Sequence, residues 1–268
     1  MSRLYGRGGA QMSFGPPQTP EIIKNLMIAN GLVFIAQLLG PGLGFDVTRW
    51  GVVQPNAVWG DFQFWRIFTY MWLHSTGSFM HIAFNMFSLW MFGSTLALLW
   101  GEQRFLRYYL VCGVGAGFLI ASVPVMVNWM GMGSAAELFG MTLGASGAVM
   151  GVLLAYSFTW PDRTLMLLFP PIPIKAIYLI PLIFFMEYLS SRSGGDNISH
   201  IGHLAGVFVG WIYLINEGRT PGAPTPQTLL LKWRRYLMRQ KIRAVHRDDA
   251  RDRKDRNRRD DDDSRRFH

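Results

Sequence analysis

The sequence is short of charged residues and has almost no cysteine. Only 16% of its 268 residues are charged and 50% are hydrophobic, a balance that disfavours a soluble protein of this length. The single cysteine, Cys112, excludes an intramolecular disulfide and a cysteine metal cluster, and we expect it to pack between helices. The first 20 residues lack the apolar core of a secretory signal peptide, so we expect no cleavable signal. The sequence also lacks an internal repeat.

The hydrophobic residues are collected in long blocks. A run of roughly 17–25 apolar residues is long enough to cross a bilayer as a helix. The segment 41–78, rich in tryptophan and phenylalanine, separates the first two runs and is typical of a membrane interface. The sequence therefore predicts an all-α polytopic membrane protein, a bundle of six transmembrane helices with a long first extracytoplasmic loop. The six expected spans are 22–40, 79–99, 104–127, 141–160, 172–190 and 199–216.

The positive charges are distributed unequally between the two sides of the expected bundle. With six spans, both termini lie on one side, and that side carries 23 of the 26 lysine and arginine residues. Only Arg49, Arg66 and Arg192 fall on the other side. Because loops rich in Lys and Arg remain in the cytoplasm, this asymmetry predicts a multi-pass protein of the cell (cytoplasmic) membrane with both termini in the cytoplasm.

Both ends of the chain differ in composition from the bundle. Residues 1–21 are predicted to form a disordered cytoplasmic arm, residues 22–216 the membrane domain, and residues 217–268 a basic cytoplasmic tail. From residue 218 onward there are 16 basic and 8 acidic residues, and the segment 228–245 has the pattern of a basic amphipathic helix. Because such helices bind anionic lipid surfaces, we expect the bilayer and its anionic lipids as partners, and no nucleic acid.

Two reactive side chains fall at membrane depth. Ser146 lies near the outer end of the fourth span and His203 near the outer end of the sixth, so the two side chains can meet. Polar groups in lipid are costly and mark candidate functional sites, and this pair is typical of a serine nucleophile activated by a histidine. A serine in a glycine-rich helix crossing can also serve packing alone. Small residues spaced by four allow these helices to approach closely, at Gly147 and Gly151 and at Gly206 and Gly210.

A second polar pair lies at the same depth. His81 and Asn85 share one face of the second span near its outer end. Their side chains are suitable donors to an oxyanion, together with the backbone N–H of Ser146 at a helix start, whereas interhelical hydrogen bonding is their alternative role. In the catalytic interpretation, His203 takes the proton of the Ser146 hydroxyl. The serine then attacks a peptide carbonyl and forms an acyl-enzyme, which water hydrolyses.

Taken in order, these elements resemble the rhomboid family of intramembrane serine proteases. The resemblance covers about residues 22–216 and is to the bacterial six-span type. It implies a Ser146–His203 dyad without an acid, and an oxyanion hole made of His81, Asn85 and the Ser146 amide. It also implies that the substrates are transmembrane segments of other membrane proteins. The matching motifs are Trp65-Arg66, His81-x-x-x-Asn85, Gly144-x-Ser146-Gly147 and His203-x-x-Gly206-x-x-x-Gly210.

Some features depart from the family pattern or leave alternatives open. The position four residues after the serine, often aromatic in the family, is Met150, and His200 is a second candidate for the base. We prefer His203 because it alone has glycines three and seven residues later. The histidines lack carboxylates at metal-ligand spacing, so we expect no metal and no cofactor. The competing functions are client binding by a catalytically silent member of the same fold, and a small transporter, although paired repeats are absent.

Overall fold

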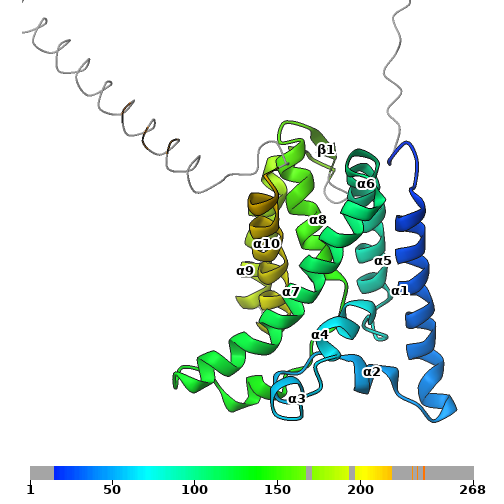
Figure 1. Ribbon diagram of the computed structural model, residues 1–268, viewed down its shortest axis with the longest axis vertical. Coiled ribbons are helices and arrows are strands. Elements are labelled where there is room, and N and C mark those ends of the chain that lie inside the picture. The colour runs from blue at the N-terminus through cyan, green and yellow to red at the C-terminus, as the bar shows by residue number, and fades with distance from the viewer. Residues whose placement is uncertain are drawn as a thin grey trace, which may run out of the picture. The chain divides into compact units, whose positions relative to one another are not determined.

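The computed structural model describes residues 15–166, 171–192 and 197–218, together with Leu231, Arg234 and Met238. The chain divides into two units, Met1–Ala223 and Pro224–His268, and the membrane bundle belongs to the first. The predictions for residues 1–14 and for most of the basic tail with its amphipathic segment lie outside the described residues, as do residues 193–196 before the sixth span. The described part is a helical membrane bundle, as the hydropathy pattern predicts (Figure 1).

Three apolar helices in the described ranges are long enough to cross a membrane. Their positions agree with the first three expected spans. The turn between the second and third depends on Gly101, whose φ of 85° would strain any other residue. The three helices are α1 (Glu21–Leu39, extended by the 3-10 turn η1, Gly40–Leu43), the composite α5 (Phe79–Ser88), η3 (Leu89–Gly93, a π-helical turn) and α6 (Ser94–Trp100), and α7 (Glu102–Trp129).

The segment between α1 and α5 folds into short helices against the bundle. The side chain of Arg66 is only 6% exposed and forms hydrogen bonds with several parts of this segment. Its guanidinium donates to the backbone carbonyls of Arg49 (3.0 Å) and Val52 (2.7 Å), and its Nε donates to Gln63 Oε1 (2.6 Å). The long first loop is therefore a structured element. Its helices are α2 (Val47–Gly51), α3 (Pro55–Trp59), α4 (Arg66–Thr69) and the 3-10 turn η2 (Tyr70–Trp72).

The helix α8 (Ser146–Thr159) is shorter than the expected span 141–160. Its 14 residues extend roughly 21 Å, less than the ~30 Å hydrocarbon core of a bilayer. The backbone before it is not helical, and such backbone is tolerated at membrane depth only where protein shields it. The first loop supplies that shield, because Val53 and Thr142 exchange two backbone hydrogen bonds (3.0 and 2.9 Å) and the Gly144 N–H donates to the Tyr70 carbonyl (3.0 Å).

Helix α8 lies at the centre of the bundle. Ten of its 14 residues are buried, and Figure 1 shows it between α10 (Asn197–Glu217) on one side and α5 and α6 on the other. Helix α10 packs mainly on α8 and α7. A helix that is apolar on all sides belongs in the core of a bundle, and this is where α8 lies.

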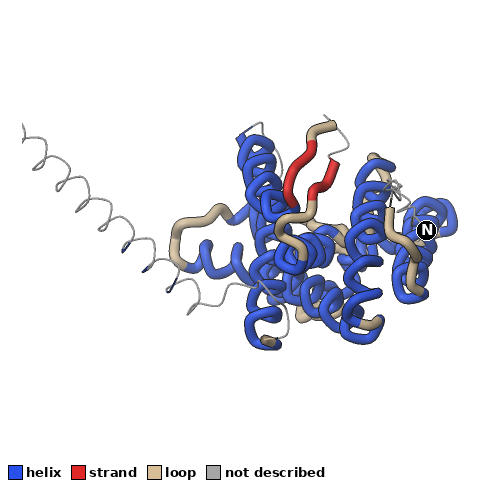
Figure 2. The backbone as a smooth tube through the Cα atoms, turned by 90° about the horizontal axis from the view of Figure 1, so that it is seen from above, coloured by secondary structure: helices blue, strands red, loops and turns tan. Residues whose placement is uncertain are grey.

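The chain between α8 and α9 (Leu179–Arg192) contains a feature that hydropathy does not indicate. Strands β1 (Thr164–Met166) and β2 (Pro173–Lys175) pair antiparallel, with Leu165 opposite Ile174, and the 3-10 turn η5 (Ala176–Tyr178) then leads into α9. Figure 2 shows the two strands beside the helix ends. The expected span 172–190 therefore begins as a strand. The total of six membrane crossings remains a prediction.

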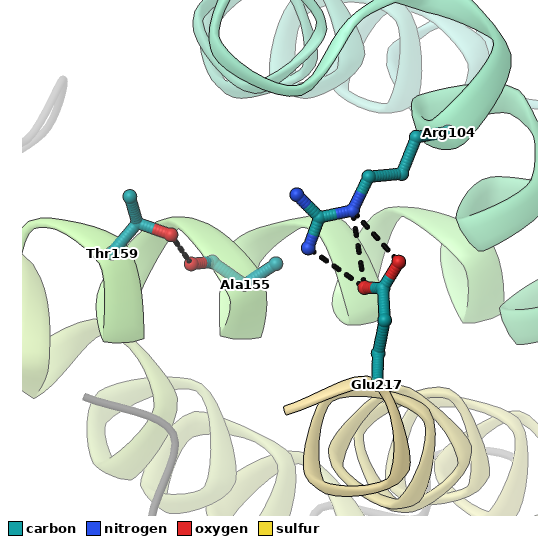
Figure 3. Close-up of polar contacts among 4 residues, drawn as sticks. All are labelled: Arg104, Ala155, Thr159 and Glu217. Atoms are coloured by element: carbon teal, nitrogen blue, oxygen red, sulfur yellow. Dashed lines mark hydrogen bonds and ion pairs between the residues drawn. The ribbon is translucent and has the colours of Figure 1, made fainter. Parts of the chain in front are cut away.

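The first turn of α7 and the last turn of α10 are joined by an ion pair (Figure 3). The Nε of Arg104 lies 2.9 and 3.1 Å from the two carboxylate oxygens of Glu217, and Nη2 lies 2.7 Å from Oε2. The same guanidinium lies 4.4 Å from the ring centroid of Trp100. The two charged side chains are 15% and 18% exposed, so solvent screens this pair less than it screens an open surface pair.

We expect Glu217→Gln to lower the free energy of unfolding by about 2 kcal/mol. This value lies between the roughly 0–1 kcal/mol of exposed ion pairs and the roughly 3–5 kcal/mol lost when a buried pair is broken. A double-mutant cycle with Arg104→Gln, read by reversible unfolding in mixed micelles, measures the coupling. The control is Asp162→Asn, which breaks the exposed ion pair with Lys175 (side chains 85% and 54% exposed) and should change little. Equal effects of the two substitutions would contradict the expectation.

Candidate active site

The predicted polar residues of three helices line one cavity. Ser146 of α8, His203 of α10, and His81 and Asn85 of α5 all border a cavity of about 360 Å³. The structure thus brings together the four side chains that sequence spacing singled out. Most of the remaining wall is apolar, and it is completed by Ser78, Met80, Phe84, Ser88, Val149, Met150 and Leu153.

Ser146 is the first residue of α8. The first N–H groups of a helix have no carbonyl partner within the helix, and the positive end of the helix dipole lies beside them. The hydroxyl therefore lies next to backbone donors that can bind negative charge. A serine at this place can act as a nucleophile whose product oxyanion is stabilised by the helix that carries it.

Gly144 leaves the space between Ser146 and His81 open. A methyl group at Gly144 would lie 3.0 Å from both Cε1 and Nε2 of His81 and 3.6 Å from Ser146 Oγ. The φ of Gly144 is 131°, a backbone conformation that disfavours any side chain. Glycine is thus favoured at position 144 for two reasons: its backbone conformation disfavours a side chain, and a side chain would crowd His81 and Ser146. The distances also place the imidazole edge of His81 next to the serine.

The hydrogen bonds that His81 and Asn85 form determine which of their N–H groups remain available to a ligand in the cavity. The Ser75 N–H donates to Nδ1 of His81 (3.2 Å), and Nδ2 of Asn85 donates to the His81 carbonyl (2.8 Å). An imidazole nitrogen that accepts a hydrogen bond carries no proton, so neutral His81 has its proton on Nε2, the nitrogen near Gly144. One of the two amide N–H groups of Asn85 is used by the His81 carbonyl. Both residues can thus donate to an anion in the cavity.

Glycines bring α8 and α10 into backbone contact, as the small-residue spacing predicts. A methyl group at Gly206 would collide with the carbonyl oxygen of Gly147, and one at Gly151 would lie 3.4 Å from the carbonyl oxygen of Gly206. A methyl group at Gly210 would lie 3.2 Å from Cα of Gly151. This close crossing sets the position of His203 relative to Ser146, because both residues lie within one turn of it.

His203, rather than His200, lines the cavity in the described part of α10. This placement favours His203 as the base of the two candidates. Met150, which takes the place of the aromatic residue often found in the family, is also in the cavity wall, where a thioether can pack against an imidazole. Within the described ranges, no three His, Cys, Asp or Glu residues come together as they would in a metal site.

Buried His74 lies beside the site, in the segment before α5. Its ring is fully buried and 5.3 Å from the ring of His81, in an edge-on arrangement. Burial lowers the pKa of His74 from 6.5 to about 4, and the charge of protonated His81 contributes in the same direction. His74 is therefore neutral at physiological pH. The backbone of His74 is connected to the cavity by a hydrogen bond, because the peptide between His74 and Ser75 donates its N–H to Nδ1 of His81.

We expect the lowered pKa of His74 to make the protein less stable in mild acid. Between pH 6.5 and about 4 the unfolded chain binds a proton at this residue and the folded chain does not, so stability falls as the pH falls through that interval. The full effect is about 3 kcal/mol, because lowering a pKa by one corresponds to roughly 1.4 kcal/mol. Midpoints of thermal unfolding across this range should drop more steeply for the wild type than for His74→Phe. Parallel pH profiles would rule out this role of His74.

The fold and the cavity define a helical membrane protein with a serine and a histidine on one cavity inside the bundle. Residues 61–219 match the family model of the rhomboid domain, and the chain belongs to the rhomboid family. The match includes Ser146, His203, His81 and Asn85, and the resemblance to the rhomboid family that the motifs indicate is confirmed.

Known proteins similar to this chain come from animals, fungi and plants. The Presenilin-associated rhomboid-like protein, mitochondrial, of Mus musculus is 31% identical over 196 residues, 72% of this chain and 47% of that protein. The Rhomboid protein 1, mitochondrial, of Saccharomyces cerevisiae is 28% identical over 183 residues, 63% of this chain and 51% of that protein. The RHOMBOID-like protein 5 of Arabidopsis thaliana is 26% identical over 179 residues, 66% of this chain and 52% of that protein. This chain thus matches about half the length of these relatives.

The expected location in the cell (cytoplasmic) membrane is wrong, because the relatives from Mus musculus and Saccharomyces cerevisiae are both named as mitochondrial proteins. The distribution of lysine and arginine indicates which loops stay on the side of synthesis or insertion. It contains no information about which membrane receives the protein. The predicted cytoplasmic position of both termini was part of the same expectation and is corrected with it.

Proposed function

We propose that this protein is an intramembrane serine endopeptidase that cleaves transmembrane segments of other membrane proteins. The observation that carries the proposal is the cavity that Ser146, His203, His81 and Asn85 line together at the start of α8. Because the cavity lies in a bundle that spans the membrane, its substrates are segments that enter from the bilayer. The mitochondrial names of two relatives support a mitochondrial membrane as its location.

The reaction begins at the serine hydroxyl. His203 takes the proton from Ser146 Oγ, which attacks the carbonyl carbon of the peptide bond. The carbonyl oxygen becomes an oxyanion, which accepts hydrogen bonds from the Ser146 N–H, from Nε2 of His81 and from the amide of Asn85. His203 then protonates the leaving amine, and the C–N bond breaks to leave an acyl-enzyme.

Water completes the cycle. His203 takes a proton from a water molecule, which attacks the acyl ester, and the second oxyanion occupies the same donors. The ester bond to Ser146 Oγ breaks, the serine regains its proton from His203, and the new carboxylic acid leaves and gives up its proton to water. The dyad needs no acidic third member for this sequence, because the histidine itself passes each proton between the serine, the leaving amine and water.

The test uses the full chain in lipid vesicles with a single-span reporter protein. We expect cleavage of the reporter, and we expect a fluorescent alkyl fluorophosphonate, which loses fluoride when an activated serine attacks its phosphorus, to label the protein at Ser146. A competing role as a binder of membrane clients predicts reporter binding with neither cleavage nor label. A transporter lined by the same residues predicts the same lack of chemistry. Either negative result with correctly folded protein would overturn the proposal.

A further inference from the structure

The side chain of Gln37, near the end of α1, forms two hydrogen bonds with the backbone of His74. It is only 3% exposed. Its Oε1 accepts the His74 N–H (2.8 Å), and its Nε2 donates to the His74 carbonyl (3.0 Å). Nε2 also donates to Thr48 Oγ1 (2.9 Å). A polar side chain buried in an apolar span is costly unless its hydrogen bonds are satisfied, and here every partner lies in the segment between α1 and α5.

These hydrogen bonds leave one orientation for the amide. With the oxygen and nitrogen exchanged, the NH₂ group would face the His74 N–H, and the amide oxygen would face the His74 carbonyl. Two donors or two acceptors would then meet in a buried place, and the hydrogen bonds lost there would not be replaced by water. The direction of the Gln37 amide is thus determined by its surroundings.

The carbonyl that Gln37 holds belongs to the same peptide unit as the Ser75 N–H. A peptide unit is planar and trans, so fixing the direction of its C=O fixes the opposite direction of its N–H. That N–H donates to Nδ1 of His81 (3.2 Å). Gln37 and His81 therefore hold the two ends of one rigid group, and a donor on the carbonyl also strengthens the N–H as a donor.

The protonation of His81 depends on this peptide. With Nδ1 accepting from Ser75, the single proton of neutral His81 lies on Nε2, within reach of the space beside Ser146 Oγ that Gly144 leaves open. The opposite tautomer would place an unshared pair of electrons where the oxyanion forms and would repel it. The rate of the reaction thus depends on which nitrogen carries the proton.

We propose that Gln37 is a positioning residue that keeps His81 in the Nε2–H tautomer by orienting the peptide between His74 and Ser75. The inference rests on the proposed function for its effect on rate, although the tautomer itself is a property of the resting protein. Gln37 does not line the cavity, so it acts through the peptide rather than on the substrate.

The tautomer is measured by nitrogen NMR of protein labelled at its six histidines, with the His81 signal assigned from a His81→Ala sample. The wild type should show His81 protonated on Nε2 alone. In Gln37→Leu the peptide loses its donor, and both tautomers should be present. A role of Gln37 in packing alone would lower the melting temperature without changing these signals.

The kinetic readout is cleavage of the single-span reporter. We expect Gln37→Leu to lower kcat roughly tenfold with KM unchanged, less than the roughly hundredfold loss when an oxyanion donor is removed outright. Thr48→Val is the matched control, because it removes one hydrogen bond of the same amide and leaves both bonds to His74. It should keep the wild-type tautomer and kcat.

Gln37→Glu provides a second test that does not depend on whether the Gln37→Leu protein folds. A protonated glutamic acid has one donor and one acceptor in the places of the amide, whereas the carboxylate repels the His74 carbonyl. Burial raises the pKa of such a carboxyl, so the acid form is populated at mildly acidic pH. The ratio of the variant's kcat to that of the wild type should therefore rise as the pH falls. Taking the ratio cancels the pH effects that the two proteins share.

The two proposals fail in different ways. A folded Gln37→Leu protein that retains the single Nε2–H tautomer, or that cleaves at the wild-type rate, overturns the role of Gln37. A pH-independent ratio for Gln37→Glu overturns it as well. If the wild type cleaves nothing while the tautomer changes as expected in Gln37→Leu, the proposed protease function fails and the structural link from Gln37 to His81 stands.

Discussion

Replacing Ser146 by alanine should abolish cleavage of a transmembrane reporter, with a loss of kcat/KM of at least about 10³-fold. The change removes the nucleophile at the first position of α8, and no acyl-enzyme can then form. His203→Ala should reduce the rate to a similar level, because an unassisted hydroxyl is a poor nucleophile at neutral pH. The double variant should be no slower than either single variant, since the two side chains act in one step. Initial rates in vesicles, at matched protein and substrate density, measure all three.

The control is Ser122→Ala, which removes a serine hydroxyl bonded to the Phe118 carbonyl (2.7 Å) on α7, away from the cavity. It should cleave at the wild-type rate. Thermal unfolding of Ser146→Ala should match that of the wild type, because the lost hydroxyl lies in a cavity and leaves no packing defect. Reporter cleavage that persists in Ser146→Ala would show that another residue is the nucleophile.

Gly206→Ala should be the most damaging methyl addition in the bundle. The new Cβ would collide with the Gly147 carbonyl oxygen, so α8 and α10 must separate. Overpacking of this kind costs roughly 1–3 kcal/mol or more, because a backbone cannot move aside as a side chain can. The same separation moves His203 away from Ser146, and a displacement of about 1 Å can cost on the order of 100-fold in rate. We therefore expect losses in both stability and activity.

Gly31→Ala is the matched control for this substitution. It adds the same methyl group to a helical glycine, on α1, where no atom lies within 4 Å of the new Cβ. Alanine favours a helix over glycine by about 0.5–1 kcal/mol, so the control should be neutral or slightly stabilising. Unfolding midpoints and cleavage rates of the two variants form the comparison. If Gly206→Ala behaves like Gly31→Ala, the helices are not in backbone contact at this crossing.

The helices were well predicted from hydropathy where lipid is their main surrounding. Spans expected at 22–40, 79–99 and 104–127 correspond to α1, to α5 through α6, and to α7. The fourth expected span, 141–160, is longer than the helix because the apolar run begins before the first residue of α8. Those extra residues are shielded by the first loop rather than by lipid, through Val53 and Tyr70. Hydropathy measures how apolar a segment is, and it does not distinguish burial in protein from burial in lipid.

Candidate residues of the cavity were predictable because their signal is local. Ser146 beside Gly147, His81 four residues before Asn85, and His203 with glycines at fixed distances each form a short pattern on one helix, and helical spacing places each pattern on one face. Gln37 was missed in the sequence interpretation. A polar residue inside the apolar run 22–40 was a sufficient signal to single it out, although its partner 37 positions away in the chain was not readable.

The sequence by itself determined a membrane bundle, the depth of the polar side chains and the membership in the rhomboid family, because hydropathy, spacing and motif order are properties of the chain as written. Only the tertiary structure decided that the four polar residues share one cavity, that α8 is short and shielded, and that a peptide held by Gln37 faces His81. These features depend on contacts between segments far apart in the chain. Such contacts form when the apolar faces and glycine crossings bring the helices together, and no local pattern records them.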